Sequence, residues 1–269
     1  MQREKNALNG VGVLVTRPLK QAHVFAKRLE QSGAAPIVLP TIEITPPQDM
    51  QPLLNARARL EAYDFVMFVS ANAVEQALAT LTHWPEKVTA LAPGKGTAAA
   101  LREAGVPDQA ILMPLSRFDS EGLLELPMLQ QMQGKRVLIF RGERGRELLG
   151  ETLAARGAEV TRVTCYRRAC PESDAANTAE FLWPLLQQNR LQAITLTAGE
   201  ALDNLETMVG ETLCRELKAL PVFTLHPRIA EHAQARGWKA VDTSGNESDN
   251  SDDALICGMI SFFSASRKV

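Results

Sequence analysis

The sequence predicts an α/β protein built from doubly wound, parallel β-sheets. Short apolar runs alternate with segments of helical period along the chain, which is the pattern of parallel strands joined by crossover helices. Glycines follow several of the helical segments, as expected where a helix ends in the left-handed conformation. One strand–helix–strand unit also occurs twice, which indicates an internal duplication.

The repeated unit is clearest in residues 134–168. Residues 137–140 (VLIF) form a continuous apolar run, as expected for a strand covered on both faces. Two glycines and two arginines in residues 141–145 interrupt the run, and leucines at helical spacing follow. Gly157 ends this predicted helix, and a second strand begins at Glu159.

An earlier copy of this unit lies 124 positions before it. Seven residues recur at this constant spacing without a gap, which chance alone rarely produces. Together with the two further repeats given below, three units occur twice along the chain. We label them A, B and C in the first copy and A′, B′ and C′ in the second, and they occur in the order A, B, C, A′, B′, C′. The first pair of units matches Gly10, Val13, Leu14, Arg17, Leu29, Gly33 and Ala34 with Gly134, Val137, Leu138, Arg141, Leu153, Gly157 and Ala158. The other two repeat less cleanly, residues 70–74 as 198–202 and residues 94–105 as 226–237.

The first half of the chain begins with a buried strand over residues 11–16. Pro18 suits the first turn of a helix, and Gly33 ends that helix before a strand at residues 37–39. Residues 40–47 contain three prolines and are typical of an extended linker, so we expect a domain crossing there. The elements expected next are a helix over 53–60, a strand over 65–69, a helix from 70, a strand over 88–92, a helix after 93–97, a strand over 111–113 and a helix over 121–132.

The second half follows the same alternation after a second extended passage at residues 169–171. Its apolar runs predict further strands, and glycine again ends one of the helices, at Gly237. Residues 242–253 are rich in Gly, Ser and Asn, and we expect a mobile loop. The other elements expected are a helix through Leu182 and Leu186, a strand over 193–196, a helix from 197–202, a strand over 222–225, a helix to Arg236, an edge strand at 240–241 and a closing helix over 254–263.

Two assemblies fit this order of units. In a tandem assembly, A, B and C form one domain and the primed units form the other. In a swapped assembly, A joins B′ and C′, and the intervening units form an inserted domain. The prolines after Leu39 and the exit after Val163 fall at equivalent points of the repeat, which favours the swapped assembly. We therefore expect lobe 1 at residues 1–39 and 170–269, lobe 2 at 46–163, and linker strands at 40–45 and 164–169.

Composition argues against several classes of partner. The net charge is −2 and the pI is about 6.1, so no global positive field exists to hold nucleic acid or an anionic membrane. We identify neither a signal peptide nor an apolar run long enough to span a membrane, and we expect a cytoplasmic protein. The four cysteines lack CxxC spacing and the four histidines are scattered, so we expect no metal site.

Six motifs, taken in order along the chain, resemble those of the uroporphyrinogen-III synthase family. Each motif alone is weak, whereas the ordered set is fairly specific and spans nearly the whole chain. The resemblance implies two flavodoxin-like lobes joined by a two-stranded linker, with an active site in the cleft between them. The motifs are VTRP at residues 15–18, SANAV at 70–74, GKGTA at 94–98, SEGLL at 120–124, RG at 141–142 and CYRR at 165–168.

The resemblance also implies an activity. It implies a monomeric enzyme of tetrapyrrole (haem and sirohaem) biosynthesis, without cofactor or metal, and without a nucleic-acid or membrane partner. The implied substrate is hydroxymethylbilane, a linear tetrapyrrole with many carboxylates, received by transient handover from hydroxymethylbilane synthase. The implied reaction loses water, closes the ring and inverts ring D to form uroporphyrinogen III.

The candidate substrate-binding residues lie at strand-to-helix junctions. The implied substrate is a polyanion and the protein is slightly acidic, so carboxylates must meet main-chain N–H groups at helix N-termini, which carry about half a positive charge. In doubly wound sheets these N-termini lie at the carboxyl ends of the strands. The candidates are Arg17, Ser70, Asn72, Gly94, Lys95, Gly96, Thr97, Arg141, Gly142, Thr197 and His226.

Several of these candidates have a purely structural alternative. A side-chain oxygen can cap a helix, and a glycine can provide the conformational freedom of a tight turn. An arginine at the surface can be solvated by water or paired with an acidic side chain. Capping would explain Ser70, Asn72 and Thr97, a turn would explain Gly94 and Gly96, and solvation or pairing with acids such as Glu143 would explain Arg17 and Arg141.

Tyr166 is the predicted catalytic residue. Departure of the hydroxyl group from the bilane needs a proton, and a tyrosine stays protonated at neutral pH and can donate one. The chain has only two tyrosines, and the other, Tyr63, directly precedes a strand. The structural alternative is a linker residue that packs one face of its ring and leaves its hydroxyl in water.

The chain departs from the family pattern in the later half of lobe 1. The family has Thr-Ser where this chain has Thr197 and Ala198. It also has a Ser-led motif with a downstream Thr where this chain has His226 and Ile229. Two side-chain hydroxyls are therefore missing, and the donors there are either main-chain groups alone or include His226.

Two other functions are compatible with the composition. A non-enzymatic protein with the same two lobes would bind or sense a tetrapyrrole or another anion. A two-domain sugar- or nucleotide-binding enzyme is the weaker rival, because it predicts an acidic ribose-binding residue after a GxGxxG turn, and no such turn exists in the chain.

Overall fold

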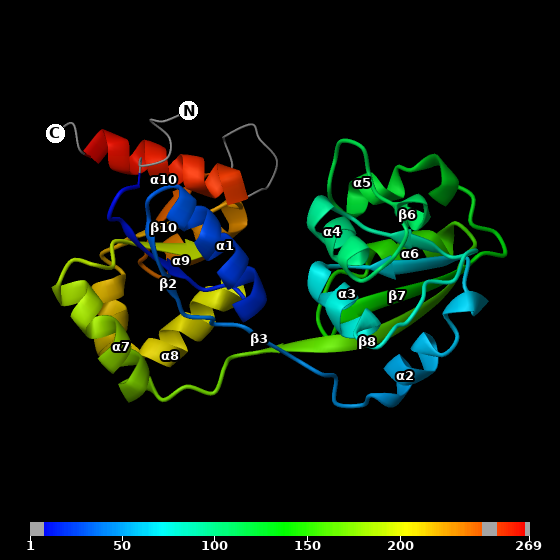
Figure 1. The fold of residues 1–269 in the computed structure, drawn as a ribbon, viewed down its shortest axis with the longest axis horizontal. Helices are drawn as coiled ribbons and strands as arrows, with labels where there is room; N and C mark the ends of the chain where they lie inside the picture. Colours follow the sequence, from blue (N-terminus) through cyan, green and yellow to red (C-terminus); the bar gives the residue numbers. More distant parts are fainter. Residues whose placement is uncertain (1–7, 244–251, 267–269) are drawn as a thin grey trace. The chain divides into compact units, whose positions relative to one another are not determined.

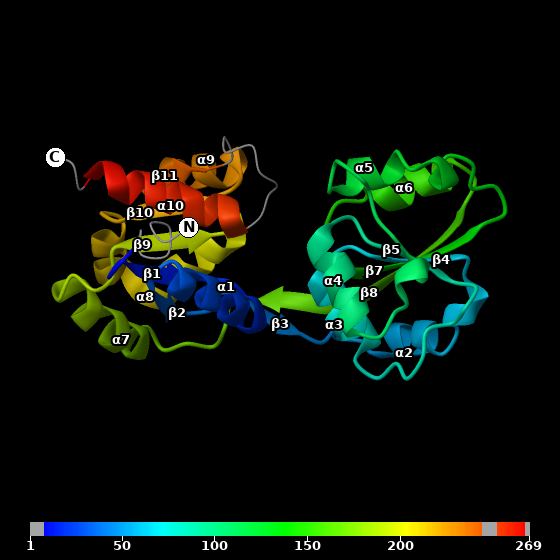
Figure 2. The same ribbon diagram turned by 45° about the horizontal axis from the view of Figure 1, so that its top comes forward.

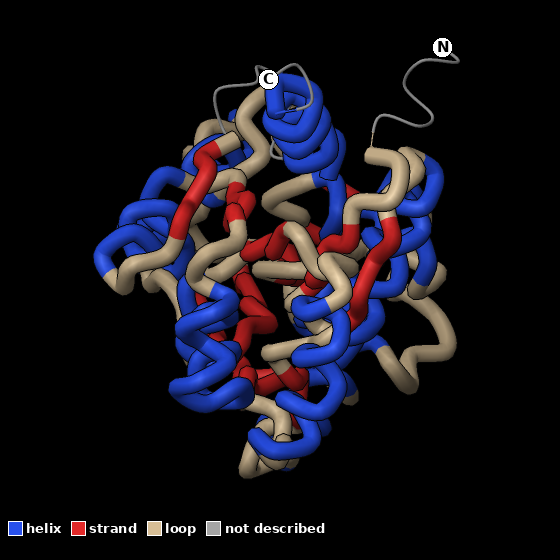
Figure 3. The backbone as a smooth tube through the Cα atoms, turned by 90° about the vertical axis from the view of Figure 1, so that its left-hand side faces the viewer, coloured by secondary structure: helices blue, strands red, loops and turns tan. Residues whose placement is uncertain are grey.

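The computed structural model describes residues 8–243 and 252–266, and within them the chain forms two compact units (Figure 1). Unit 1 comprises Met1–Glu43 and Ala169–Val269, and unit 2 comprises Ile44–Arg168. Each unit has its own β-sheet with helices packed against it. In Figure 3 the strands are drawn in red among the blue helices. The predicted fold class, α/β with doubly wound parallel sheets, is confirmed.

The sheet of unit 1 has five parallel strands in the order β11-β10-β9-β1-β2. The first two strands of the chain therefore share a sheet with the last three, which excludes the tandem assembly. The strand order reverses between β1 and β9, and this is the switch point at which doubly wound sheets bind ligands. The strands are β1 (Gly12–Val15), β2 (Ala35–Val38), β9 (Ala193–Leu196), β10 (Pro221–Thr224) and β11 (Lys239–Asp242).

Helices cover the two faces of this sheet. On one face, α1 (Leu19–Gln31) and α10 (Asp252–Ser266) lie next to each other (Figures 1 and 2) and share a buried core with β1 and β10. On the other face, α8 (Gly199–Leu217) contacts β9 and α9 (Pro227–Ala235) contacts β10, while α7 (Ala175–Gln187) packs on α8. All four residues of β1 and all four of β9 are buried, as expected for central strands that are covered on both faces.

The sheet of unit 2 has the order β3-β8-β7-β4-β5-β6. Its order matches that of unit 1 when β7 and β8 take the places of β1 and β2, and its switch point lies between β7 and β4. Compared with the sheet of unit 1, the sheet of unit 2 has one additional strand, β3, at its edge. The strands are β3 (Glu43–Thr45), β4 (Phe65–Phe68), β5 (Thr89–Leu91), β6 (Ile111–Leu112), β7 (Arg136–Gly142) and β8 (Glu159–Ala169).

The helices of unit 2 also form two layers, as Figure 2 shows. One layer consists of α2 (Gln51–Arg57), α3 (Ala71–Leu78) and α4 (Lys95–Glu103), which bury alternate residues of β4 and β7. The opposite layer consists of α5 (Ser120–Leu124) and α6 (Leu148–Ala155), which bury the intervening residues. Alternation of side chains along each strand therefore divides the core between the two faces.

The duplicated glycines have the same backbone role in the two units. Gly10 and Gly134 have φ values of 77° and 73°, and each precedes the first strand of its repeat. Gly33 and Gly157, which follow α1 and α6, have φ values of 86° and 97°. Because side chains rarely adopt such positive φ values, glycine has been retained at these four positions.

Two expectations about individual elements need correction, and a third is not tested. The helix expected over residues 121–132 is wrong, since α5 ends at Leu124 and a 3₁₀ turn, Pro127–Leu129, follows. Pro127 explains the break, because proline lacks an N–H donor and disfavours helix at the preceding residue. The helix expected over 53–60 is α2, which ends at Arg57. Most of the loop expected over 242–253 lies outside the described residues.

Candidate functional site

Three predicted residues meet at the switch point of unit 2. Ser70 follows β4, Gly142 ends β7, and Tyr166 lies on β8. The Tyr166 hydroxyl lies 3.1 Å from Ser70 Oγ, and Tyr166 is only 6% exposed. The expected structural alternative, in which the hydroxyl of Tyr166 faces water, therefore does not describe this side chain.

Gly142 makes room for the ring of Tyr166. A Cβ atom at Gly142 would lie 2.9 Å from Tyr166 Cζ and 3.1 Å from its hydroxyl oxygen. The register of β7 and β8 shifts between Arg141 and Gly142, so that Gly142 pairs with Tyr166. Gly142 is thus placed against the candidate acid, and its lack of a side chain is a packing requirement.

Ser70 has two hydrogen-bonding roles at once. It is the N-cap of α3, and its Oγ accepts a hydrogen bond from the Ala73 N–H at 3.2 Å. Its hydroxyl hydrogen can point to the Tyr166 oxygen, or its second lone pair can accept the Tyr166 proton. The capping explanation of Ser70 is correct, and it is compatible with a role beside Tyr166.

Cys165, the neighbour of Tyr166 on β8, is a structural residue. Its side chain is buried, and its Sγ lies 3.3 Å from the main-chain oxygen of Arg141. Burial raises the pKa of the Cys165 thiol to about 12. The thiol therefore stays neutral at physiological pH and is a poor nucleophile.

Arg141 organises the loop that follows β7. Its Nη2 donates to the Gly145 oxygen at 2.9 Å, its Nε donates to the Gly142 oxygen at 3.3 Å, and its Nη1 pairs with Glu147. The Arg141 guanidinium lowers the pKa of the Glu147 carboxyl by hydrogen bonding. The acid that pairs with Arg141 is thus Glu147, and Glu143, which was the expected example, is not its partner.

The N-terminus of α4 presents its main chain openly. Gly94, the N-cap, has φ −158°, which any residue adopts, and a Cβ at Gly96 would meet no atom within 4 Å. The turn therefore does not require glycine at either position, and the explanation of Gly94 and Gly96 by a tight turn alone is wrong. Thr97 is buried within α4 and is not the N-cap of that helix, so the explanation of Thr97 as a helix cap is also wrong. Lys95 Nζ lies 4.4 Å from the ring centroid of Phe118.

The remaining candidates of unit 2 and unit 1 lie between the end of a strand and the first turn of the helix that follows. Asn72 is half-buried in the first turn of α3. In unit 1, Thr197 is half-buried after β9, and His226 is the exposed N-cap of α9, without a side-chain capping bond. Arg17 follows β1 and is buried, with its Nη1 2.6 Å from Asp252 Oδ1.

Buried threonines, which sequence reasoning missed, organise the switch point of unit 1. Thr16 Oγ1 donates to the Thr195 oxygen at 2.8 Å, and Thr195 Oγ1 donates to the Leu14 oxygen at 3.1 Å. Thr41 Oγ1 lies 2.9 Å from the Ala201 oxygen in the first turn of α8. A threonine inside or just after an apolar run is the sequence signal that could have identified them. A buried hydroxyl needs a hydrogen-bond partner, so such a threonine indicates a contact with a neighbouring segment.

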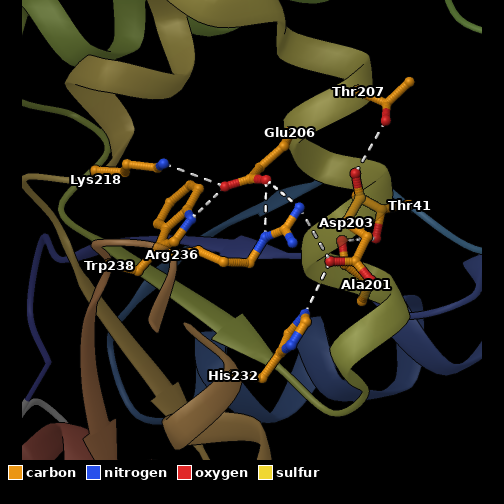
Figure 4. Close-up of polar contacts among 9 residues, drawn as sticks. All are labelled: Thr41, Ala201, Asp203, Glu206, Thr207, Lys218, His232, Arg236 and Trp238. Atoms are coloured by element: carbon orange, nitrogen blue, oxygen red, sulfur yellow. Dashed lines mark hydrogen bonds and ion pairs between the residues drawn. The ribbon is translucent and has the colours of Figure 1, made fainter. Parts of the chain in front are cut away.

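A cluster of charged residues fastens α8 to α9 (Figure 4). Glu206 accepts hydrogen bonds from Arg236 at 2.8 Å and from Trp238 Nε1 at 2.9 Å, and Asp203 pairs with His232 at 2.8 Å. Lys218 Nζ lies 3.3 Å from Glu206, although the two would be about 18 Å apart along an unbroken helix. Gly210, with φ 70°, breaks α8 and brings them together. This cluster sets the relative positions of two helices whose N-termini lie at the switch-point edge.

Comparison with known proteins identifies the family. The family model described as uroporphyrinogen-III synthase HemD matches residues 23–251. The chain belongs to the uroporphyrinogen-III synthase family. The uroporphyrinogen-III synthase of Escherichia coli K12 is 36% identical over 251 residues, which covers 91% of this chain and 98% of that protein. The Synechococcus elongatus enzyme is 34% identical and covers 77% of each chain.

Solved structures of uroporphyrinogen-III synthases share the fold. The enzyme from Helicobacter pylori matches with a TM-score of 0.55 at 16% identity, covering 94% of this chain and 99% of that one. A mutant of the Thermus thermophilus enzyme matches with a TM-score of 0.51 at 20% identity, covering 96% and 100%. These matches agree with the α/β architecture of parallel sheets.

The family resemblance seen in the sequence motifs is confirmed. The function is that of a uroporphyrinogen-III synthase, an enzyme of the lyase class in porphyrin and haem biosynthesis, and the non-catalytic alternative is not favoured. Across residues 8–243 and 252–266, no helix combines the length and the apolar character that a membrane crossing requires.

Proposed function

We propose that this uroporphyrinogen-III synthase converts hydroxymethylbilane to uroporphyrinogen III with Tyr166 as the general acid. The reaction begins with the loss of a hydroxyl group, and breaking that C–O bond is easier when the oxygen receives a proton and leaves as water. The observation that carries the proposal is the 3.1 Å contact between the Tyr166 and Ser70 hydroxyls at the switch point of unit 2.

Ser70 supports the role of Tyr166. When the phenol gives up its proton, negative charge develops on the tyrosine oxygen. The Ser70 hydroxyl, 3.1 Å away, can then donate to that oxygen, while the Ala73 N–H continues to hold Ser70 in place. Water leaves, and the substituted carbon of ring D bonds to the electron-poor carbon that remains. The bond from that ring carbon to its original bridging carbon then breaks, and the bridging carbon bonds instead to the unsubstituted α-carbon of ring D, which loses a proton. This exchange inverts the ring. The protein's larger task is to hold the chain in that geometry.

Main-chain N–H groups are the proposed donors for the substrate carboxylates. The first turns of α3, α4 and α9 contain no acidic residue that would repel an anion. Ser70 and Asn72 lie at the start of α3, and Gly94, Lys95, Gly96 and Thr97 lie at the start of α4. The open space around Gly96 lets a carboxylate approach the main chain closely. In unit 1, Arg17, Thr197 and His226 are the corresponding candidates, and Arg141 shapes the loop beside Gly142.

We also propose that the enzyme acts as a cytoplasmic monomer that receives its substrate by transient handover, without a nucleic-acid partner. The four cysteines are free, which suits a reducing compartment. Light scattering on the purified protein tests the oligomeric state, and a dimer at micromolar concentration would contradict it.

One assay tests the activity. The purified protein is incubated with hydroxymethylbilane, and the oxidised products are separated by chromatography. Uncatalysed closure gives the symmetric isomer I, so we expect the protein to divert the product to isomer III. Isomer I alone, at the rate of the buffer control, would favour a protein that only binds the tetrapyrrole.

A further inference from the structure

The guanidinium of Arg17 has an incomplete set of partners. The side chain is only 10% exposed, its Nη1 donates to Asp252 Oδ1 at 2.6 Å, and its Cζ lies 4.1 Å from the ring centroid of Phe25. Its Nε is buried and has no hydrogen-bond partner within the part of the chain that the structure describes. A buried charged donor without an acceptor is costly, so the arrangement is completed only by a further acceptor.

The geometry of arginine shows where such an acceptor belongs. A carboxylate can bind a guanidinium through two parallel hydrogen bonds, either across Nη1 and Nη2 or across Nε and Nη2. Asp252 occupies Nη1. Nε has no hydrogen-bond partner among the described residues and lies on the other edge together with Nη2, so this is the edge that a second carboxylate would approach. Phe25 covers a face of the guanidinium and so holds the plane of this edge.

Asp252 reaches Arg17 from the last helix of the chain. It is the first residue of α10, which lies next to α1 in Figures 1 and 2 and is anchored by buried residues such as Leu255 and Met259. The carboxylate also contacts Arg28, with Oδ2 3.2 Å from Nη1. The match to the family model ends at residue 251, so the family pattern itself does not assign a role to this aspartate.

We infer that Asp252 is a positioning residue for the synthase reaction. It holds Arg17 so that the edge formed by Nε and Nη2 receives one carboxylate of the linear tetrapyrrole. The inference rests on the proposed function, in which Arg17 contacts the substrate. The incoming carboxylate displaces the atoms that cover Nε, and satisfying this donor offsets the cost of that displacement.

Asp253 provides a matched control. It is adjacent in sequence and pairs with Arg28, but no contact joins it to Arg17 among the described residues, and its side chain is 67% exposed. An alanine at position 253 therefore removes a charge from the start of α10 and an ion pair with α1, as D252A does, while leaving the bond to Arg17 intact.

The experiment compares KM and kcat for hydroxymethylbilane in D252A, D253A and D252E, together with the melting temperature of each. We expect D252A to raise KM about 10-fold with kcat within about two-fold, because one charge-assisted contact with the substrate is misplaced. D253A should keep the wild-type KM, and D252E should recover most of the loss. Equal KM values for D252A and D253A, with only the melting temperature changed, would show a purely structural aspartate.

A further variant keeps the inference testable if D252A does not fold. D252N retains one oxygen acceptor for Arg17 Nη1 but loses the charge and the second oxygen, which contacts Arg28 in the wild type, so we expect a KM about three-fold above wild type. An unchanged KM in folded D252N would overturn the inference. If the wild-type protein produced only isomer I, the proposed function would fail first. If the wild-type protein produced isomer III and the variants at position 252 kept the wild-type KM, only the positioning role of Asp252 would fail.

Discussion

Replacing Gly142 with alanine tests whether the position of Tyr166 matters for catalysis. A Cβ at this position would lie 2.9 Å from Tyr166 Cζ, 3.0 Å from Cε2 and 3.1 Å from the hydroxyl oxygen. Because carbon atoms pack at about 3.5–4.0 Å, the ring must retreat by roughly 0.5–1 Å. Gly142 is not among the glycines with positive φ, so the backbone itself accepts alanine. The substitution therefore acts on the ring and moves its hydroxyl away from Ser70.

The size of the effect follows from this displacement. Misplacing a reacting group by about 1 Å costs on the order of 10²-fold in rate. We therefore expect kcat of Gly142→Ala to fall by about 10- to 100-fold. Overpacking also destabilises by about 1–3 kcal/mol, so the rate must be normalised to the folded fraction.

The assay measures the formation of isomer III from hydroxymethylbilane. Gly145→Ala is the control on the same loop, since its Cβ would meet only Arg141 Nη2, at 3.4 Å. In a Tyr166→Phe background, Gly142→Ala should cause little further loss, because the hydroxyl is already gone. Wild-type kcat in folded Gly142→Ala would refute the reasoning, since the clash must displace the ring.

Three further outcomes are expected. Tyr166→Phe should lower kcat by about 10²–10⁴-fold, the range typical of a lost general acid, and unchanged turnover in this variant would remove Tyr166 from the mechanism. Ser70→Ala should lower kcat by about 3- to 10-fold. The pKa of the Cys165 thiol is raised from 9.0 to about 12 by burial, so folding binds its proton more tightly than the unfolded chain does. Its contribution to stability is therefore complete below pH 9 and is lost as the pH rises to about 12; a Cys165→Ala variant, followed by urea titration, should show a weaker decline over that window. Gly12→Ala would place a Cβ 1.6 Å from the Arg190 main-chain oxygen and should destabilise by about 3 kcal/mol or more in urea, whereas Gly96→Ala, with open space, should stay within about 1 kcal/mol.

The local elements and the repeat were predictable from the sequence. Continuous apolar runs predicted most of the buried strands, because a strand covered on both faces must be apolar throughout. The glycines at positions 33, 105, 157 and 237 end helices with positive φ, as their placement indicated. The helix expected over residues 121–132 is wrong because Pro127 disfavours helix at the residue before it, so that α5 ends at Leu124.

The contacts of the candidate site were less predictable. The sequence indicates Ser70 and Tyr166 separately as candidates, yet 96 positions separate them and nothing in the sequence shows that their hydroxyls meet. Arg141 was expected to pair with an acid such as Glu143, and the fold of its loop selects Glu147 instead. Such pairings depend on distances across strands and loops, which spacing along the chain does not encode.

The sequence alone determined the type and order of the elements, the duplication and the family, because periodicity, glycine positions and ordered motifs are local properties of the chain. Only the tertiary structure decided which strands share a sheet, that Gly142 leaves room for Tyr166, and that Asp252 holds Arg17. The physical reason is that parallel strands pair through main-chain hydrogen bonds common to all residues. Neighbours in the sheet are therefore selected by the packing of the whole core, which no single segment specifies.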